Sequence, residues 1–235
     1  MTPTVLVIVP TYNERENLPT VVKGVMAHPG VQLLIVDDCS PDGTGEVADA
    51  LAARFAGRLE VIHRTGRRGL GLSYLDGFRC ALNRQFDLVC QMDADLSHDP
   101  SSLPALIART ADSDLVIGSR YVPGGAIVNW PNRRRWLSRW ANIYVRRVTR
   151  LGVRDCTSGF RCWRRRALEA LPLDRVRSDG YSFLIETLYM AVGWGGRVAE
   201  VPITFVERRQ GASKLSAVVL TESLWTPWRL IATKP

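Results

Sequence analysis

The chain has 235 residues, of which 46% are hydrophobic, and carries a formal net charge of +8. This length and apolar share fit one domain with a sizeable core and exclude an intrinsically disordered chain. No apolar run approaches the roughly 18 residues of a membrane-spanning helix, and the first residues show no signal-peptide pattern. The five cysteines form no C-x-x-C pair, which favours reduced thiols and a cytoplasmic location.

The first half of the chain alternates between two patterns. Apolar runs typical of buried strands occur at Val5–Val9, Leu33–Val36, Leu59–His63, Leu88–Met92 and Asp114–Ile117. Amphipathic stretches typical of helices lie between them, at Glu16–His28, Thr44–Phe55, Leu70–Arg84 and Ser101–Thr110. This alternation predicts an α/β fold whose mostly parallel central sheet carries helices on both faces.

The second half is less regular. Its patterns predict a helix over Tyr181–Val192 and a strand over Arg197–Val206. After Lys214 the chain reads as an amphipathic helix that we expect to be interrupted at Pro227. No repeat, low-complexity tract or composition shift marks a second domain.

Two carboxylates follow the fourth predicted strand directly. Asp93 and Asp95 come after the run Leu88–Met92, at the strand end where α/β proteins bind ligands. Residues two apart share one side of an extended chain, so both carboxylates can face one ion. Mg²⁺ commonly binds one or two carboxylates together with substrate phosphates. The pattern indicates a metal bridge to a nucleotide diphosphate, although an isolated Asp-x-Asp is also typical of a solvated turn.

The first two predicted strands also end in polar loops. Pro10-Thr11-Tyr12-Asn13-Glu14 offers groups that suit a nucleobase and a ribose, or alternatively the start of a helix. After the second strand, Asp37 and Asp38 are not needed for the turn Pro41-Asp42-Gly43. We expect one of these two carboxylates to bind the nucleoside, and Thr44 to cap the next helix.

A glycine-rich loop, Arg64-Thr65-Gly66-Arg67-Arg68-Gly69-Leu70-Gly71-Leu72, follows the third strand. It matches neither G-x-G-x-x-G nor G-x-x-x-x-G-K-[ST], which argues against a mononucleotide P-loop. Its glycines still allow the backbone to approach a ligand closely.

Together these motifs resemble those of the family-2 glycosyltransferases, and within them the dolichol- or polyprenol-phosphate mannose synthases. Three later segments narrow the likeness to this lipid-phosphate branch: Gly118-Ser119-Arg120-Tyr121, Ser158-Gly159-Phe160-Arg161 and Arg208-Arg209-Gln210-Gly211-Ala212-Ser213-Lys214-Leu215. The likeness covers nearly the whole chain. It implies a single nucleotide-sugar-binding domain of GT-A type over residues 1–235, with a nucleotide-binding part at about 1–118 and an acceptor and membrane-facing part at about 119–235.

The resemblance also implies the donor-site residues. Asp93 and Asp95 would hold a divalent metal, Mg²⁺ or Mn²⁺, with Ser97 as a third contact. Arg208 and Lys214 belong to a loop that in the family closes over the donor diphosphate. The full set implied for the nucleotide sugar is Pro10, Tyr12, Glu14, Asp37, Asp38, Gly69, Asp93, Ala94, Asp95, Arg208 and Lys214.

An arginine-rich block points to the acceptor. Residues 133–166 contain twelve arginines and one acid, Asp155, which suits nucleic acid, anionic lipid or a phosphorylated substrate. A sugar acceptor hydroxyl needs a general base, and we find none. A lipid phosphate is already ionised near neutral pH and needs only cations. By the resemblance Arg120, Arg134 and Ser138 would hold it, and the residues carrying catalysis would be Asp95, Arg120, Arg134, Arg208 and Lys214.

The same block bears on the membrane. An apolar stripe at helical spacing, with arginines around it, comprises Leu137, Trp140, Tyr144, Val148 and Leu151. This pattern suits a helix lying in a membrane interface, or alternatively one packed on the sheet. We expect a peripheral protein on the cytoplasmic face of a membrane, held there by surface helices or by a membrane-anchoring partner protein.

The function implied is inverting transfer of mannose from GDP-mannose to a polyprenyl (dolichyl-type) phosphate, which releases GDP. Within this class, UDP-glucose or UDP-N-acetylglucosamine is the alternative donor. An arginine-rich nucleic-acid-binding protein is the alternative of another class, but no helix-turn-helix or stacking motif supports it, so no nucleic-acid partner is expected. A non-catalytic nucleotide-binding module fits less well, because the acidic and basic site residues are intact.

Overall fold

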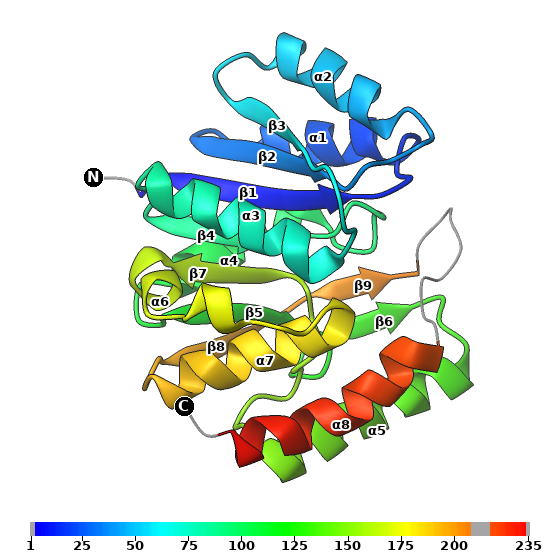
Figure 1. The fold of residues 1–235 in the computed structure, drawn as a ribbon, viewed down its shortest axis with the longest axis vertical. Helices are drawn as coiled ribbons and strands as arrows, with labels where there is room; N and C mark the ends of the chain where they lie inside the picture. The colour runs from blue at the N-terminus through cyan, green and yellow to red at the C-terminus, as the bar shows by residue number, and fades with distance from the viewer. Residues whose placement is uncertain (1–2, 208–216, 234–235) are drawn as a thin grey trace.

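The computed structural model describes residues 3–207 and 217–233 of the chain (Figure 1). Its helices and strands follow one another in this order: β1 (Val5–Thr11), α1 (Leu18–Met26), β2 (Val31–Asp37), α2 (Thr44–Arg54), β3 (Leu59–His63), α3 (Leu70–Asn83), β4 (Leu88–Gln91), η1 (Pro100–Ser102), α4 (Leu103–Arg109), β5 (Leu115–Ser119), β6 (Ala126–Val128), α5 (Asn132–Thr149), β7 (Arg161–Arg164), α6 (Arg165–Glu169), η2 (Leu173–Arg175), α7 (Gly180–Gly193), β8 (Val198–Pro202), β9 (Thr204–Val206) and α8 (Ala217–Ala232). The η elements are short 3₁₀ helices.

Seven strands form the central sheet, in the order β3-β2-β1-β4-β7-β5-β8. Strand β7 runs antiparallel to both of its neighbours, β4 and β5, and every other pair in this sheet is parallel. Strands β4 and β5 therefore point the same way, and the carboxyl ends of β1, β2, β4 and β5 lie at one edge. A small second sheet pairs β6 with β9.

Helices cover both faces of the sheet, and each face has its own apolar core. One core joins Phe78 of α3, Phe183 of α7 and Trp163 of β7, and the other joins Leu18 of α1 with Leu106 of α4. Figure 1 shows α3, α6 and α7 on the near face and α1 and α4 behind the sheet. The prediction of a mostly parallel sheet with helices on both faces is confirmed.

Close packing of α3 on the sheet depends on a glycine. Gly77 faces Ile8 of β1, and a Cβ at this position would lie 2.7 Å from the Ile8 side chain. Any larger residue would push α3 away from the strand, because interiors are close-packed. This contact fixes the height at which the first turn of α3 meets the carboxyl edge of the sheet.

The single strand predicted over Arg197–Val206 was wrong in one respect, because the structure has two strands there. β8 extends the large sheet beside β5, whereas β9 leaves it and pairs with β6. The break falls at Pro202, the last residue of β8, which has no N–H to continue a ladder. This switch between sheets carries the chain from the core towards the carboxyl edge.

The predicted interruption at Pro227 was also wrong, because α8 continues through this residue. Proline inside a helix costs about 3 kcal/mol. The contacts that follow it oppose this cost: Leu230 is buried in the core, and Trp228 Nε1 donates to Tyr144 Oη of α5 at 2.8 Å. Tertiary packing beyond the proline thus keeps the helix in one piece.

Candidate functional site

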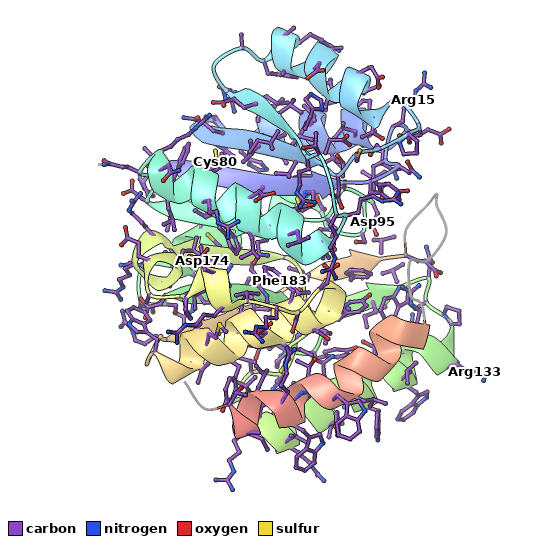
Figure 2. The ribbon with its side chains drawn as sticks, viewed as in Figure 1. Arg15, Cys80, Asp95, Arg133, Asp174 and Phe183 are labelled. Atoms are coloured by element: carbon purple, nitrogen blue, oxygen red, sulfur yellow. The ribbon has the colours of Figure 1, made fainter. Side chains whose placement is uncertain are left out.

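The site begins where β1, β2 and β4 end side by side. Thr11 and Asp37, the last residues of β1 and β2, face each other in register, and the Thr11 hydroxyl donates to Asp37 at 3.0 Å. Asp38 N donates to Thr11 O at 2.9 Å, which joins the loops after the two strands. Figure 2 shows Asp95, from the loop after β4, at this same end of the sheet.

Asp37 is held by its own turn. The Ser40 hydroxyl and backbone N–H donate to its two carboxylate oxygens, at 2.6 and 3.2 Å respectively. With Thr11, these donors hold the carboxylate in one orientation. Asp37 is therefore a fixed hydrogen-bond acceptor at the carboxyl edge.

Asp38 connects the second loop to the glycine-rich loop. It accepts a hydrogen bond from Gly69 N at 2.8 Å and forms an ion pair with Arg64. Arg64 also contacts Asp76 of α3 at 2.7 Å. Asp38 and Gly69, both implied by the resemblance, are in direct contact. Arg64 was not among the predicted site residues, since one arginine in a basic chain gives no signal by itself.

Glu14 and Tyr12 are positioned from different directions. Glu14 accepts from Asn17 Nδ2 at 2.8 Å, and its backbone N–H donates to the Thr44 hydroxyl at 3.0 Å. The Arg68 guanidinium lies 4.8 Å from the Tyr12 ring centre. The prediction that Thr44 caps α2 was wrong, because Gly43 is the N-cap and the Thr44 hydroxyl serves the Glu14 loop instead.

Asp93 and Asp95 differ in environment. Asp95 is buried and accepts from the Ser97 hydroxyl at 2.5 Å and from Ser97 N at 3.1 Å. Asp93 is partly exposed, and the Tyr74 hydroxyl lies 3.3 Å from one of its oxygens. Burial, with the charge of Asp93 adding to it, raises the pKa of Tyr74, which keeps this phenol a donor. Tyr74 was missed because nothing in its sequence context distinguishes it from a core residue of α3.

Small and aromatic side chains surround the Asp93 carboxylate. Asp93 N donates to His98 Nδ1 at 3.2 Å, and the His98 ring stacks on Phe160 at 5.1 Å. A Cβ on Gly159 would lie 3.3 Å from both Asp93 oxygens. A larger residue at 159 would crowd the carboxylate, so the Ser158–Arg161 segment limits the space beside Asp93.

Arg161 of that segment has a structural task. It is fully buried and donates to the carbonyls of Ser158, Leu184 and Cys156 at 2.8, 2.8 and 2.9 Å. Burial lowers its pKa to about 10. The side chain thereby fixes the turn that places Gly159 against Asp93.

The donor set at Asp93 and Asp95 fits a hard divalent cation that shares its shell with phosphates. Within residues 3–207 and 217–233, no group of three or more His, Cys, Asp or Glu side chains could hold a metal ion alone. Of the described chain, Asp93 and Asp95, with Ser97, would supply ligands to such a cation, and the remaining ligands would come from substrate or water.

Arg120 follows β5, at the same edge as Asp93. It forms a two-pronged pair with Asp155, in which Nε and Nη2 donate at 2.7 and 2.6 Å, and Nη2 also donates to Thr157 at 2.8 Å. Both side chains are buried. Burial opposes ionisation, but the Arg120 guanidinium holds the pKa of Asp155 below its usual range. The lone acid of the arginine block, not predicted as a site residue, thus orients Arg120.

A cavity of about 300 Å³ lies beside Arg120. It is lined by the β5–β6 connection and the first two turns of α5, through Arg120, Tyr121, Gly125, Ala126, Ile127, Asn132, Arg135, Trp136 and Arg139. Ser138 adjoins it, because the Tyr121 hydroxyl hydrogen-bonds the Ser138 hydroxyl at 2.7 Å. We call this space the acceptor cavity; its three arginines suit an anionic group.

Arg134 lies beside this cavity and does not line it. Its guanidinium pairs with Glu207 at 2.9 Å and sits 4.1 Å from the Trp130 ring centre. Glu207 is the residue immediately before the segment that carries Arg208 and Lys214, both of which lie outside the described residues. The ion pair connects α5 to the start of that segment.

The predicted apolar stripe on α5 divides in two. Leu137 and Trp140 are 56% exposed, whereas Leu151 is buried and Tyr144 packs on the core. The Tyr144 hydroxyl donates to Leu224 O of α8 at 2.7 Å. The first part of the stripe is thus exposed, and the later part packs on the protein. None of the described helices has the length and apolarity to cross a bilayer.

Comparisons with known proteins agree with this geometry. The family model described as Glycosyl transferase family 2 matches residues 6–171. A Mycolicibacterium smegmatis protein named "Polyprenol monophosphomannose synthase" is 50% identical over 94% of this chain and 84% of its own length. A Micrococcus luteus protein named "Undecaprenyl-phosphate mannosyltransferase" is 45% identical over 97% of this chain and 95% of its own length.

Solved structures share the fold at low identity. Glucosyl-3-phosphoglycerate synthase from Mycobacterium tuberculosis, in complex with Mn²⁺, UDP-glucose and phosphoglyceric acid, matches with a TM-score of 0.67 and 19% identity. The match covers 96% of this chain and 79% of that one. The predicted GT-A-type fold is confirmed by this likeness together with the family match.

Proposed function

The chain belongs to the family-2 glycosyltransferases, and we propose that it transfers mannose from GDP-mannose to a polyprenyl (dolichyl-type) phosphate with inversion. One observation carries the proposal. The carboxyl edge of a single sheet presents the Asp93 and Asp95 carboxylates after β4 and, through Arg120 after β5, an arginine-lined cavity. A nucleotide sugar and an anionic acceptor could therefore meet there.

The donor would lie across the loops after β1, β2 and β4. Its nucleoside would contact Pro10, Tyr12, Glu14 and either Asp37 or Asp38, and the remaining proposed donor contacts are Gly69, Ala94, Arg208 and Lys214. Asp37 and Asp38 are held by hydrogen bonds or an ion pair before any ligand binds. A preorganised acceptor of hydrogen bonds loses little free energy in reorienting when the ligand arrives.

Asp93 and Asp95, with Ser97 as the proposed third contact, would hold Mg²⁺ or Mn²⁺ against the donor diphosphate. The cation would neutralise charge that develops on the departing nucleoside diphosphate. Ser97 already orients Asp95 through its hydroxyl. Arg208 and Lys214 would add positive charge to the diphosphate site, because the leaving group becomes more negative as the sugar bond breaks.

The acceptor phosphate would attack without a general base. Its oxygen forms the new bond to the anomeric carbon while the bond from that carbon to the diphosphate oxygen breaks, so GDP leaves with its electron pair. Arg120, Arg134 and Ser138 would position the phosphate, and arginine matches phosphate with two parallel hydrogen bonds. Asp155 keeps Arg120 ionised and directed towards the cavity wall.

The names of the relatives support mannose as the sugar and a polyprenyl phosphate as the acceptor. The two parts of the chain would have different roles: residues 1–118, approximately, would bind the nucleotide, and residues 119–235, approximately, would face the acceptor and the membrane. A lipid acceptor would require the protein to work at a membrane surface, on the cytoplasmic face, through its exposed tryptophans or an anchoring partner protein.

A donor panel tests the proposal. GDP-mannose, UDP-glucose and UDP-N-acetylglucosamine would each be incubated with a short polyprenyl phosphate and Mg²⁺, and the glycolipid product measured. We expect product with GDP-mannose, none without the lipid phosphate, and very little in the Asp95→Asn variant. Product from UDP-glucose or UDP-N-acetylglucosamine but not from GDP-mannose would make that UDP-sugar the donor in place of GDP-mannose. No product from any donor would overturn the proposed transferase activity.

A further inference from the structure

A second cavity lies on the same face of α5 as the acceptor cavity. It measures about 470 Å³ and is lined by Ile143, Arg146, Arg147, Arg150 and Leu151. The α5 residues around the acceptor cavity are Asn132, Arg135, Trp136 and Arg139, and four residues of the second cavity continue their spacing of three and four. One helical face therefore carries both cavities.

The arginines of the second cavity lack the carboxylate partners that other arginines of the described chain have. Among the described residues, Arg146, Arg147 and Arg150 form no ion pair with a carboxylate. The Nε of Arg146 is buried and has no hydrogen-bond partner among the described residues. By contrast, Arg120 and Arg134 each have a carboxylate partner. Three neighbouring guanidinium groups that find no counter-ion in the described part of the chain favour an external anion.

The rest of this helical face indicates where that anion comes from. Trp136, Trp140 and Ile143 are 72%, 56% and 40% exposed. They follow one another on α5 at helical spacing, and Ile143 lines the second cavity. Trp225 and Trp228 of α8, which packs beside α5, are 74% and 52% exposed. Tryptophan prefers the boundary between lipid and water. The exposed stripe therefore suits a bilayer surface, with the arginines at the level of lipid phosphates.

We propose that this second cavity binds the phosphate of an anionic membrane phospholipid. Ile143 and Leu151 provide an apolar wall for the lipid below its phosphate. The two cavities are centred about eleven residues apart on α5, or roughly 16 Å at 1.5 Å per residue. A bound phospholipid would thus hold the C-terminal half of α5 at the membrane and leave the acceptor cavity open to its substrate.

The proposal goes beyond the sugar transfer, because it requires no particular donor or acceptor. Sedimentation with phosphatidylcholine vesicles, with and without phosphatidylglycerol, tests it by binding alone. The test variant is Arg147→Gln/Arg150→Gln, which changes two exposed arginines and spares Arg146. The control, Lys23→Gln/Arg54→Gln, removes the same charge from exposed positions on α1 and α2.

We expect the Arg147/Arg150 variant to bind phosphatidylglycerol vesicles about 10- to 30-fold more weakly than the unmodified chain. The control should stay within about twofold, and thermal melting should be unchanged in both variants. Vesicles given equal negative charge by a fatty-acid carboxylate should bind less well than phosphatidylglycerol vesicles. Equal binding to the two vesicle types, or equal loss of binding in both variants, would show that general charge attraction, and not this cavity, holds the protein on the vesicles. Either result would overturn the proposal.

Calorimetry with inorganic phosphate distinguishes a lipid from a free anion. We expect no saturable heat that depends on Arg147 and Arg150. Saturable phosphate binding that the double variant loses, with unchanged vesicle binding, would assign the cavity to a free phosphate and contradict the lipid. Failure of the donor panel leaves these binding measurements unaffected, so the two proposals can fail separately.

Discussion

The acidic edge and the arginine-lined region hold their charges in different ways. At the edge, Asp37 and Asp95 are fixed by hydroxyl and N–H donors three and two residues along the chain. In the arginine region, Arg120 is fixed by a carboxylate 35 residues away and Arg134 by one 73 residues away. Local turns thus supply part of the acidic edge, where Thr11, Arg64 and Gly69 also reach Asp37 and Asp38 from distant segments, whereas Arg120 and Arg134 take their carboxylates from distant segments alone.

The difference has an energetic consequence. Asp93, whose side chain is partly exposed, can exchange its partner for water at small cost. A buried pair such as Arg120 and Asp155 cannot, because removing one partner leaves the other charge without water or counter-ion. Substitution of Asp93 should therefore change activity with little effect on folding, whereas substitutions at the buried pair should change both.

The largest effect is expected at that pair. Arg120→Ala should lower the free energy of unfolding by about 3–5 kcal/mol, because Asp155 stays buried without its counter-ion. Urea denaturation measures this loss, and the double variant Arg120→Ala/Asp155→Ala should lose less than the sum of the two single variants. Additive losses would show that the two residues act separately and would remove the basis of the comparison.

The same pair predicts a pH dependence. Burial opposes ionisation of Asp155, but Arg120 lowers its pKa in the folded state below the ordinary value of about 4. The stabilisation is therefore complete above that value and is lost as the pH falls through the folded pKa. Acid denaturation of Asp155→Asn should begin from lower stability and decline less steeply below pH 4. An unchanged slope would contradict the coupling.

The next largest effect concerns the metal carboxylates. Asp93→Asn and Asp95→Asn should each reduce turnover by about 10²-fold or more, the size of a lost electrostatic contact to the leaving group. Stability should change little at Asp93, which is partly exposed. Asp99→Asn is the matched control, because this exposed carboxylate of the same loop accepts, among the described residues, only from Ser101 N, at 2.9 Å. Activity that survives EDTA would contradict a metal role for Asp93 and Asp95.

Arg134→Ala separates the acceptor from the donor. The variant loses one arginine–phosphate contact near the surface. After the cost of desolvation is subtracted, the free energy of that contact corresponds to about 30- to 150-fold weaker use of polyprenyl phosphate. GDP affinity should stay within about twofold. Arg133→Ala is the control, since Arg133 is the exposed neighbour that points away from the molecule at the start of α5 (Figure 2). Equal losses of donor and acceptor binding in Arg134→Ala would contradict its assignment to the acceptor.

The smallest effect is expected for the nucleoside contact. GDP with Mg²⁺ should bind without any lipid, and Asp37→Ala should weaken this binding by about three- to tenfold, the size of one or two lost hydrogen bonds. Calorimetry measures both constants. Asp49→Ala should leave GDP binding unchanged, because this exposed carboxylate of α2 pairs with His63 at 2.9 Å, away from the loops after β1 and β4. Tight UDP binding with no GDP binding would contradict GDP-mannose as the donor and favour a UDP-sugar instead.

Much of the donor edge was readable from the sequence. The strands and helices of the first half were predicted within a few residues, because apolar runs and amphipathic periods directly encode burial in a parallel sheet. Asp93 and Asp95 were visible because they directly follow a buried strand. Ser97, the hydrogen-bond partner of Asp95, lies in the same loop, so the local pattern already contained it.

The errors and omissions lie where distant segments meet. Pro227 stays inside α8 because Leu230 and Trp228 find partners in the core and on α5, which a local proline rule does not include. Tyr74 acquires its place at Asp93 only because α3 packs across the sheet. Likewise, β9 leaves the large sheet because β6 offers it a partner, and that pairing joins residues far apart in the chain.

The sequence by itself determined the fold class, the order of the strands and helices in the first half and the acidic loops, because these depend on short-range patterns of apolar and charged residues. Only the tertiary structure decided which arginine does what. The twelve arginines of the basic block, and Arg120 before it, look alike in sequence, but the fold buries Arg120 against Asp155, pairs Arg134 with Glu207 and leaves Arg146, Arg147 and Arg150 around a cavity. The physical reason is that a guanidinium takes its role from its counter-ion and its burial, and both are set by segments distant in sequence.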